Sequence, residues 1–238
     1  HTLNPRLFVD QLAYIVQQAG DRVIFSDPAY AELLREILPK CPSVEWVVFF
    51  SGGEKAEVGV PVLDFGSLLV ERHDPIRWGD FDERTAAGLC YTSGTVGNPK
   101  GVLYSHRSNY LHTLMILQGD VFGFTVADCI LPVVPMYHAN AWGVTFAAPA
   151  VGARLVLPGA RVDGRSLYEL MENEGVTIAL GVPTVWLSFL EYLTVNKLRP
   201  STLKRVIVGG AACPETVLRR FRDLGIEAIH AWGMTEMS

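Results

Sequence analysis

A segment rich in glycine and hydroxyl groups is the strongest sign of chemistry in the sequence. Residues 91–101 read Tyr-Thr-Ser-Gly-Thr-Val-Gly-Asn-Pro-Lys-Gly, with three glycines and three Thr or Ser hydroxyls around one lysine. Glycines allow the backbone N–H groups to approach a polyanion closely, and the hydroxyls add further donors. Lys100 supplies a mobile cation. We therefore expect a phosphate-binding loop here; an ordinary Gly-rich hairpin tip is the alternative.

Other phosphate and nucleophile motifs do not match this chain. In the Walker pattern a second glycine would stand at Pro99, and Ser or Thr would stand at Gly101. The Gly-x-Gly-x-x-Gly pattern, the Gly-x-Ser-x-Gly elbow and a Cys–His nucleophile pair are also missing. The expected loop therefore differs from those of P-loop NTPases and dinucleotide-binding proteins.

Two later motifs, the second of them in two parts, add further candidate residues. Residues 135–143 read Pro-Met-Tyr-His-Ala-Asn-Ala-Trp-Gly, residues 208–212 read Val-Gly-Gly-Ala-Ala, and residues 231–236 read Ala-Trp-Gly-Met-Thr-Glu. The absence of side chains at Gly209 and Gly210 suits a flat ring held against the backbone. A plain bend after a strand is the alternative for this glycine pair, and a structural histidine is the alternative for His138.

Taken in order, the three segments resemble the adenylate-forming superfamily, which includes acyl-CoA synthetases, firefly luciferase and peptide-synthetase adenylation domains. Within it, His-Ala-Asn-Ala-Trp-Gly is most similar to medium- and long-chain fatty acyl-CoA synthetases. Amino-acid-activating members place an Asp in this region, whereas no acid lies between Asp128 and Asp163. An amino-acid substrate would find no counter-charge there.

The resemblance implies a role for each matching residue. It implies that ATP or AMP contacts Thr92, Ser93, Gly94, Thr95, Gly97, Lys100, Gly209, Gly210, Ala211, His230, Ala231, Trp232, Gly233, Met234 and Thr235. It implies catalytic roles for Lys100, Thr235 and Glu236, Mg²⁺ coordination by Thr92 and Glu236, and an acyl pocket lined by His138, Asn140 and Trp142. Trp232 stands where the family usually has Tyr and keeps a ring face that could stack on adenine; a core aromatic is the alternative interpretation. Val96 stands where the family usually has Thr and removes one hydroxyl.

The implied reaction joins a fatty acid, ATP and CoA to give acyl-CoA, AMP and pyrophosphate through an acyl-adenylate. A carboxylate is ionised near neutral pH and needs no general base to attack phosphorus. An aryl- or short-chain acid:CoA ligase is one alternative, and a non-catalytic nucleotide-binding domain is another. Glu236 counts against the second, because such a domain needs no metal-binding acid there.

The elements that would position these residues alternate along the chain, which predicts an α/β fold with two largely parallel sheets flanked by helices. Expected helices are 10–19, 28–38, 108–117, 142–149, 166–174, 183–192 and 214–221. Expected strands are 23–25, 44–50, 88–92, 101–104, 128–133, 154–157, 177–180, 205–208 and 227–230. Residues 51–87 are expected to be a surface connection.

We expect the sheets to divide near residue 120, giving subdomains of about 1–120 and 121–238. The whole chain is expected to be a fragment of the N-terminal AMP-binding domain without the C-terminal lid. The ribose-binding acid, hinge and lid lysine would then lie beyond Ser238, and the isolated fragment would be inactive.

Composition limits the remaining choices. Twenty Lys and Arg against 25 Asp and Glu give a net charge of −5, which argues against nucleic-acid binding. Four cysteines without a CxxC pair argue against a zinc or disulfide framework and favour the cytoplasm. The uncharged run 129–153 contains prolines and glycines, so we expect buried strand, loop and helix rather than a transmembrane span. No signal peptide is apparent, and a homodimer is left open.

Overall fold

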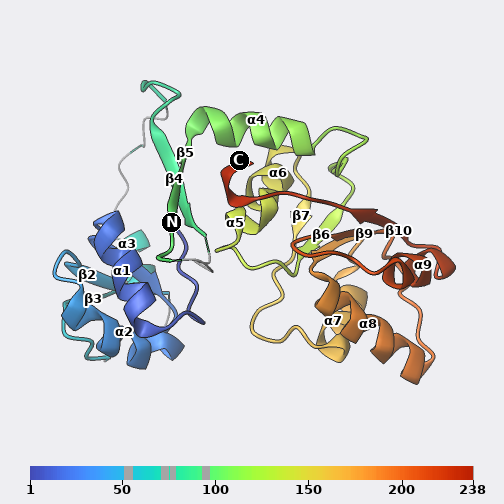
Figure 1. The fold of residues 1–238 in the computed structure, drawn as a ribbon, viewed down its shortest axis with the longest axis horizontal. Helices are drawn as coiled ribbons and strands as arrows, with labels where there is room; N and C mark the ends of the chain where they lie inside the picture. The colour runs from blue at the N-terminus through green and yellow to red at the C-terminus, as the bar shows by residue number, and fades with distance from the viewer. Residues whose placement is uncertain (51–55, 71–74, 76–78, 93–96, 238) are drawn as a thin grey trace. The chain divides into compact units, whose positions relative to one another are not determined.

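Parallel strands form the two main sheets of the computed structural model, which describes residues 1–50, 56–70, 75, 79–92 and 97–237 (Figure 1). The chain divides into two compact units. The first contains His1–Asp82 and Tyr91–Gly101, and the second contains Glu83–Cys90 and Val102–Ser238. Each unit is described by itself below.

The first unit is built on a parallel sheet with the order β1-β2-β3. Its strands are β1 (Val23–Ser26), β2 (Trp46–Phe49) and β3 (Val62–Asp64), and its α-helices are α1 (Val9–Ala19), α2 (Ala31–Ile37) and α3 (Phe65–Val70). Short 3₁₀ turns, Pro28–Tyr30 and Leu38–Lys40, flank α2. The buried residues Leu12 and Val16 of α1, Leu34 of α2 and Val47 of β2 share one core cluster. Helix α1 ends at Gly20, whose φ of 67° is the left-handed conformation that glycine accepts without strain.

The second unit is built on a larger parallel sheet with the order β10-β9-β8-β6-β7. Its strands are β6 (Cys129–Pro132), β7 (Arg154–Leu155), β8 (Ile178–Gly181), β9 (Arg205–Val208) and β10 (Glu227–His230). Its main helices are α4 (His106–Ile116), α6 (Val144–Ala150), α7 (Gly164–Glu174), α8 (Pro183–Asn196) and α9 (Glu215–Asp223).

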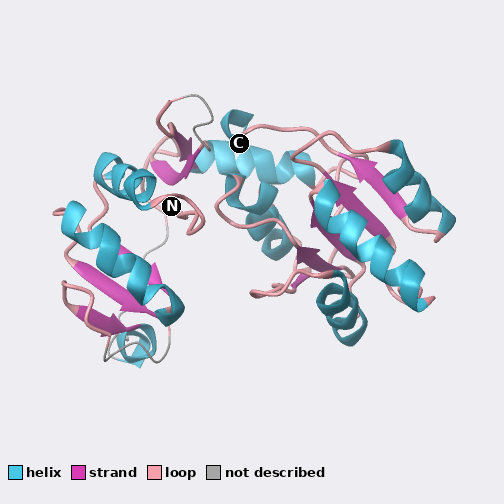
Figure 2. Ribbon diagram, turned by 60° about the horizontal axis from the view of Figure 1, so that its bottom comes forward, coloured by secondary structure: helices cyan, strands magenta, loops and turns pink. Residues whose placement is uncertain are grey.

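Helices cover both faces of this sheet (Figures 1 and 2). Side chains of α7, α8 and α9 share a core cluster with Leu131 and Ala179, whereas those of α4 and α6 share another with Ile130 and Leu180. These neighbours in β6 and β8 face opposite sides because successive strand residues alternate. The sheet is therefore buried on both faces, as expected for parallel strands with nearly uniform apolar sequence.

Strands β4 (Ala86–Tyr91) and β5 (Gly101–Ser105) pair in a separate two-stranded sheet among the described residues. The two parallel sheets of the predicted α/β fold are confirmed, and this smaller sheet is additional. The predicted boundary near residue 120 separates the strands of the two parallel sheets but not the two compact units. The subdomain division stays a prediction.

Besides shifts of element ends by a few residues, as at α8, the structure differs from the expected elements in three segments. The connection expected at 51–87 contains β3 and α3, and the helix expected at 28–38 is a 3₁₀–α–3₁₀ succession because Pro28 and Pro39 interrupt regular hydrogen bonding. The helix expected from residue 142 begins at Val144, after a turn described below. The run 129–153 forms β6, a loop, that turn and α6, as expected, and within the described ranges no helix is long and apolar enough to cross a membrane.

Candidate functional site

Two of the three sequence motifs lie at the carboxyl edge of the larger sheet. Because its strands are parallel, their carboxyl ends meet at one edge, which is where open α/β sheets bind ligands. Gly209, Gly210 and Ala211 follow β9, and Ala231 with the residues up to Glu236 follows His230 at the end of β10. The segment 135–143 follows β6 at the same edge.

The glycine pair contacts the indole of Trp142. A Cβ atom on Gly209 would lie 3.1 Å from Trp142 Cη2 and 3.0 Å from the Ala231 carbonyl oxygen. A Cβ on Gly210, whose φ is 77°, would lie 3.5 Å from Trp142 Cζ2 and 3.2 Å from Val182 Cγ1. The backbone of the glycine pair therefore lies against a flat ring that belongs to this chain, the indole of Trp142. The contact of this pair with adenine stays a prediction.

Trp142 lies in a turn, residues 139–142, whose backbone has the left-handed conformation. Residues 139–142 have φ values of 44°, 52°, 52° and 57°, and Gly143 follows at 75°. The turn is closed by bonds from the Trp142 N–H to the His138 carbonyl at 3.3 Å and from the Gly143 N–H to the Ala139 carbonyl at 3.1 Å. Each non-glycine residue in this conformation costs about 1–2 kcal/mol. Strain of this kind persists only where surrounding contacts hold it, and it is common at ligand sites.

Several side chains hold this turn. The carbonyl oxygen of Asn140 accepts from the Thr145 hydroxyl at 3.2 Å, and its side-chain Oδ1 accepts from Cys90 Sγ at 3.5 Å. The ring of His112 packs so closely below the turn that a Cβ on Gly143 would lie 2.6 Å from its Nδ1. Desolvation lowers the pKa of both His112 and His138. Sequence reasoning gave His112 no role in the site, and no spacing signal could have placed it beneath Gly143.

Most side chains in the segment after β10 are exposed to solvent. Trp232 is 79% exposed, so in this chain it is no core aromatic and its ring faces are accessible. Residues 235–237 form one 3₁₀ turn, Thr235–Met237. The hydroxyl of the buried Tyr104 donates to the Thr235 carbonyl oxygen at 2.5 Å. This contact was missed by the sequence analysis, because 131 residues separate its partners.

The base of the predicted phosphate loop belongs to the first unit. The Thr92 N–H donates to the Lys100 carbonyl at 3.0 Å, and the Lys100 N–H donates to Thr92 Oγ1 at 3.2 Å, which closes the loop. Gly97 has a φ of 84°, which glycine accepts. Ser93, Gly94, Thr95 and Val96 lie outside the described residues. The phosphate contacts of the loop therefore stay predictions.

The oxygen donors fit Mg²⁺ by their chemistry. Mg²⁺ prefers oxygen ligands and usually takes one or two carboxylates together with phosphate oxygens. The Glu236 carboxylate is exposed, and no ion pair or hydrogen bond holds it in the part of the chain that the structure describes. Those same residues contain no group of three or more His, Cys, Asp or Glu that could hold a metal by itself.

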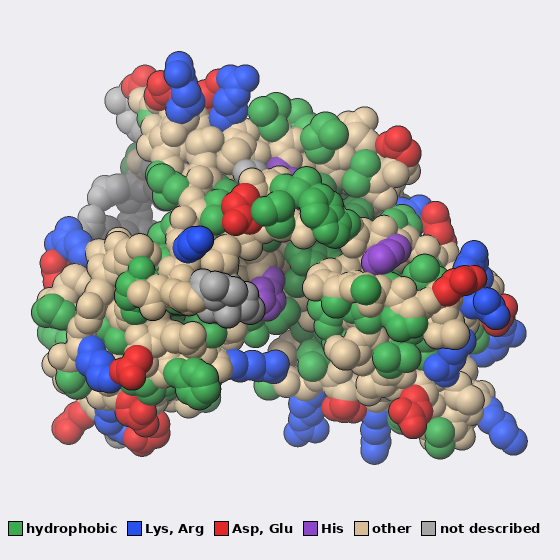
Figure 3. Space-filling model, viewed as in Figure 1, with side chains coloured by type: hydrophobic (Ala, Val, Ile, Leu, Met, Phe, Trp, Pro, Cys, Tyr) green, Lys and Arg blue, Asp and Glu red, His purple; other side chains and the backbone are tan. Residues whose placement is uncertain are grey.

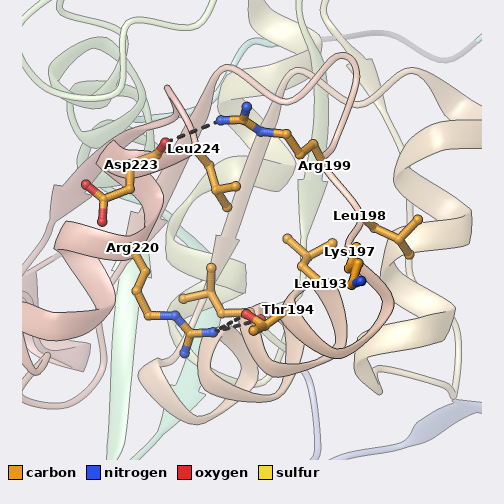
Figure 4. A pocket seen from close by; sticks show the side chains of 9 residues that line it. Leu193, Thr194, Lys197, Leu198, Arg199, Arg220, Asp223 and Leu224 are labelled. Carbon is orange, nitrogen blue, oxygen red and sulfur yellow. Dashed lines mark hydrogen bonds between the residues drawn. The ribbon is translucent and has the colours of Figure 1, made fainter.

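A cavity of about 340 Å³ between the ends of α8 and α9 contains none of the predicted residues (Figure 4). Arg220 donates there to the Leu190 carbonyl and the Thr194 hydroxyl, and Arg199 donates to the Asp223 carbonyl. The bonds of Arg220, which lies on α9, to Leu190 and Thr194 of α8 link the two helices, and Arg199 bonds a carbonyl at the end of α9, so the arginines stabilise the packing of α8 and α9. On the face drawn in Figure 3, acidic and basic side chains are interspersed.

A two-sided parallel sheet with glycines, an exposed aromatic ring and a carboxylate at its carboxyl edge is typical of α/β nucleotide-binding proteins. The family described as AMP-binding enzyme matches residues 1–238, and the chain belongs to this family. The chain is 46% identical over its whole length to a medium-chain-fatty-acid–CoA ligase of Ectopseudomonas oleovorans, covering 44% of that protein. It is 44% identical over its whole length to a long-chain-fatty-acid–CoA ligase of Thermus thermophilus, covering 43% of it. It thus spans less than half the length of the curated relatives it matches.

Solved structures confirm the fold. An anthranilate CoA ligase in complex with anthranoyl-AMP superposes on 98% of the chain with a TM-score of 0.87 at 22% identity, and the match covers 45% of that ligase. An O-succinylbenzoate coenzyme A synthetase of Bacillus subtilis, in complex with ATP and magnesium ion, superposes on 98% of the chain with a TM-score of 0.76 at 23% identity, covering 44% of that protein. The predicted α/β fold and family resemblance are both confirmed.

Proposed function

We propose that the intact protein containing this chain is a fatty acyl-CoA synthetase. It would use ATP to convert a fatty acid into an acyl-adenylate and then transfer the acyl group to CoA. The observation that carries this proposal is 46% identity along the whole chain to a medium-chain-fatty-acid–CoA ligase. The residues of the three motifs provide the groups that the reaction needs.

In the first step, a carboxylate oxygen of the fatty acid attacks the α-phosphorus of ATP. The bond from the α-phosphorus to the bridging oxygen breaks, and pyrophosphate leaves with the electron pair. Trp232 offers an exposed face for adenine, the Thr235 hydroxyl would contact the α-phosphate, and Lys100 would neutralise charge on the leaving pyrophosphate. Mg²⁺ bound through Thr92 and Glu236 would neutralise further phosphate charge.

In the second step, the thiolate of CoA attacks the acyl carbon and AMP leaves as the acyl–phosphate bond breaks. The proposed acyl site is the segment of His138, Asn140 and Trp142 at the carboxyl edge of the sheet. Between Asp128 and Asp163 the chain has no acidic residue that could pair with an ammonium group. This favours an uncharged acyl chain over an amino acid.

A shorter acid is the second candidate substrate. The chain is 45% identical over its whole length to a 3-methylmercaptopropionyl-CoA ligase of Ruegeria pomeroyi, covering 45% of that protein. This identity is almost equal to that with the medium-chain ligase. Substrate length is therefore the property that the experiment must determine.

The test is acid-dependent pyrophosphate release by the purified intact protein. The panel contains straight-chain acids from C4 to C16, 3-methylmercaptopropionate, benzoate and an amino acid, with Glu236→Gln as the matched inactive control. A maximum with medium or long chains supports the proposal, and a maximum with 3-methylmercaptopropionate or benzoate supports the alternative ligase. Tight ATP binding without pyrophosphate release from any acid would identify a non-catalytic nucleotide-binding protein.

We also propose a cytoplasmic location, supported by the four free cysteines Cys41, Cys90, Cys129 and Cys213. Fractionation of the source cells tests the location. A homodimer remains a separate proposal, and light scattering of the intact protein tests it.

A further inference from the structure

A buried tyrosine hydrogen-bonds the backbone of the predicted catalytic turn. Tyr104 lies on β5 and is 1% exposed, and its hydroxyl donates to the Thr235 carbonyl oxygen at 2.5 Å. Both residues belong to the second unit. This distance is at the short end of the range for O–H···O hydrogen bonds.

The ring of Tyr104 is held in place by its own strand pair. A Cβ on Gly88 of β4 would lie 3.8 Å from Tyr104 Cδ2, which is ordinary contact distance. Backbone bonds from His106 to Thr85 at 3.1 Å and from Arg107 to Glu83 at 2.8 Å fix the end of β5. The phenol therefore offers its hydroxyl from a rigid position.

Within the part of the chain that the structure describes, the turn that receives this bond is mostly exposed. Trp232, Met234 and Glu236 are exposed, and Thr235–Met237 contains no buried residue. The Met237 N–H donates to the Met234 carbonyl at 3.1 Å, which is a bond within the segment. The bond from Tyr104 instead links the segment to a buried strand.

The atom that accepts this hydrogen bond determines which part of the turn is restrained. The Thr235 carbonyl belongs to the peptide group between Thr235 and Glu236, and a peptide group is planar from one Cα atom to the next. A hydrogen bond to its oxygen therefore restrains the Cα atoms of both residues together. The hydrogen bond from Tyr104 thus restrains the backbone from which the Thr235 hydroxyl and the Glu236 carboxylate project.

We infer that Tyr104 is a positioning residue that orients Thr235 toward the α-phosphate of ATP and Glu236 toward Mg²⁺. This inference rests on the proposed function for the roles of Thr235 and Glu236. Tyr104 itself touches neither ATP nor the fatty acid in this scheme. It acts through the peptide group that it holds.

The variant Tyr104→Phe removes the hydroxyl and keeps the ring that fills the site. Its matched control is Thr202→Val, which removes a hydroxyl that donates to the Val176 carbonyl at 2.9 Å in the same unit. Each variant thus loses one side-chain bond to a backbone carbonyl. Thr202 precedes β9, at the opposite end of the strand from Gly209.

Two measurements on the intact protein test the inference. Calorimetry gives the affinity for ATP in Mg²⁺ and in EDTA, and ATP–pyrophosphate exchange is followed as Mg²⁺ is raised. Tyr104→Phe should lose most of the gain in ATP affinity that Mg²⁺ provides, and its exchange rate should fall by about 10- to 100-fold, as expected for a small displacement of catalytic groups. Higher Mg²⁺ should restore part of this rate. Thr202→Val should match the wild type in both measurements.

The inference is overturned if Tyr104→Phe binds ATP with wild-type dependence on Mg²⁺ and exchanges at the wild-type rate. It is also overturned if both variants lose binding and exchange equally, because that would show a general loss of stability. Failure of the proposed function looks different. The wild type would then release no pyrophosphate with any acid, while the calorimetric comparison would still show whether Tyr104 orients the metal-binding turn.

Discussion

The two ends of the larger parallel sheet differ in how their polar groups are bonded. At the amino ends, Asp128 accepts from the Thr177 hydroxyl at 2.9 Å and from the Thr125 hydroxyl at 2.8 Å. Arg205 donates to Glu227 on the neighbouring strand at 2.7 Å and to the Phe122 carbonyl at 2.7 Å. At the carboxyl ends stand two glycines, an exposed tryptophan and Glu236, for which the described residues offer no partner.

This difference separates residues that stabilise the sheet from residues available to a ligand. Polar groups at the amino ends already have partners in the folded chain, so a ligand would have to compete with them. At the carboxyl ends Gly210 is exposed, although a Cβ there would contact Val182, and the carboxylate of Glu236 has no partner within the described chain. One sheet thus carries a stabilising edge and a predicted binding edge, and substitutions at the two edges should have different consequences.

The largest effect is expected for Glu236→Gln in the intact protein. Loss of a metal-binding carboxylate should slow ATP–pyrophosphate exchange by about 1,000-fold, about 4 kcal/mol, while the similar size of the amide preserves folding. The control at the amino ends is Glu227→Gln, which weakens a partly exposed ion pair worth about 1 kcal/mol. It should leave exchange unchanged. If both variants show the same ATP–pyrophosphate exchange rate, Glu236 is not part of the site.

Trp142→Ala should affect substrate choice more than stability. The indole is half-buried against one core cluster, so its loss should cost about 1–2 kcal/mol and shift the preferred chain length among C4 to C16 acids. Trp186→Ala is the control, because Trp186 is fully buried and donates to the Gly181 carbonyl at 3.0 Å. It should cost about 3–5 kcal/mol in thermal or urea unfolding without changing the preference. A large stability loss with an unchanged preference would assign Trp142 to the core.

Gly209→Ala should destabilise the binding edge by about 1–2 kcal/mol, because the added Cβ overlaps the indole of Trp142 and the Ala231 carbonyl. Gly119→Ala is the control, since no atom lies within 4 Å of a Cβ there. The double variant Gly209→Ala/Trp142→Ala should recover part of the unfolding free energy, because one of the two overlaps disappears. Strict additivity of the two single effects would contradict the contact.

Asp128→Asn should have the smallest effect, and the effect should depend on pH. Burial alone would raise the pKa of Asp128, but hydrogen bonds from Thr125 and Thr177 and the charge of Arg205 outweigh it and lower the pKa below 3.8. The ionised group therefore stabilises the fold above about pH 4, and this contribution is lost as pH falls through its lowered pKa. The variant should be about 1 kcal/mol less stable at pH 7. In urea titrations the difference should shrink as the pH falls below 3.8 and through the lowered pKa of Asp128. A difference that stays constant with pH would contradict a role for these hydrogen bonds.

The sequence predicted most elements because their signals are local. Helix α1 has apolar spacing and a terminal Gly20, and the buried strands of the larger sheet are short apolar runs between helices. β3 and α3 were missed because they are short and share few buried contacts: α3 contains no buried residue. The left-handed turn before α6 was also missed, since no local preference favours it at Ala139 or Ala141.

For the site, motif resemblance identified residues next to one another in sequence but not the residues that support them. Trp142 and Gly209 were both singled out, yet their mutual contact depends on the order of strands β6, β8 and β9. Tyr104 and His112 support the site through tertiary packing alone, so no spacing rule reveals them. The loop residues Ser93, Gly94 and Thr95 remain predictions.

The turn at 139–142 is, residue by residue, close to the mirror image of an ordinary helical turn: Asn140 has φ and ψ of 52° and 48°, and Ala141 has 52° and 46°. The opposite enantiomer of alanine favours this region as strongly as the natural one favours the right-handed helix. Semisynthesis with D-alanine at 139, where the side chain is only partly buried, should therefore relieve backbone strain, with the methyl group taking the place of the α-hydrogen. Chirality would then be a means of stabilising this turn that few encoded amino acids other than glycine and asparagine approach.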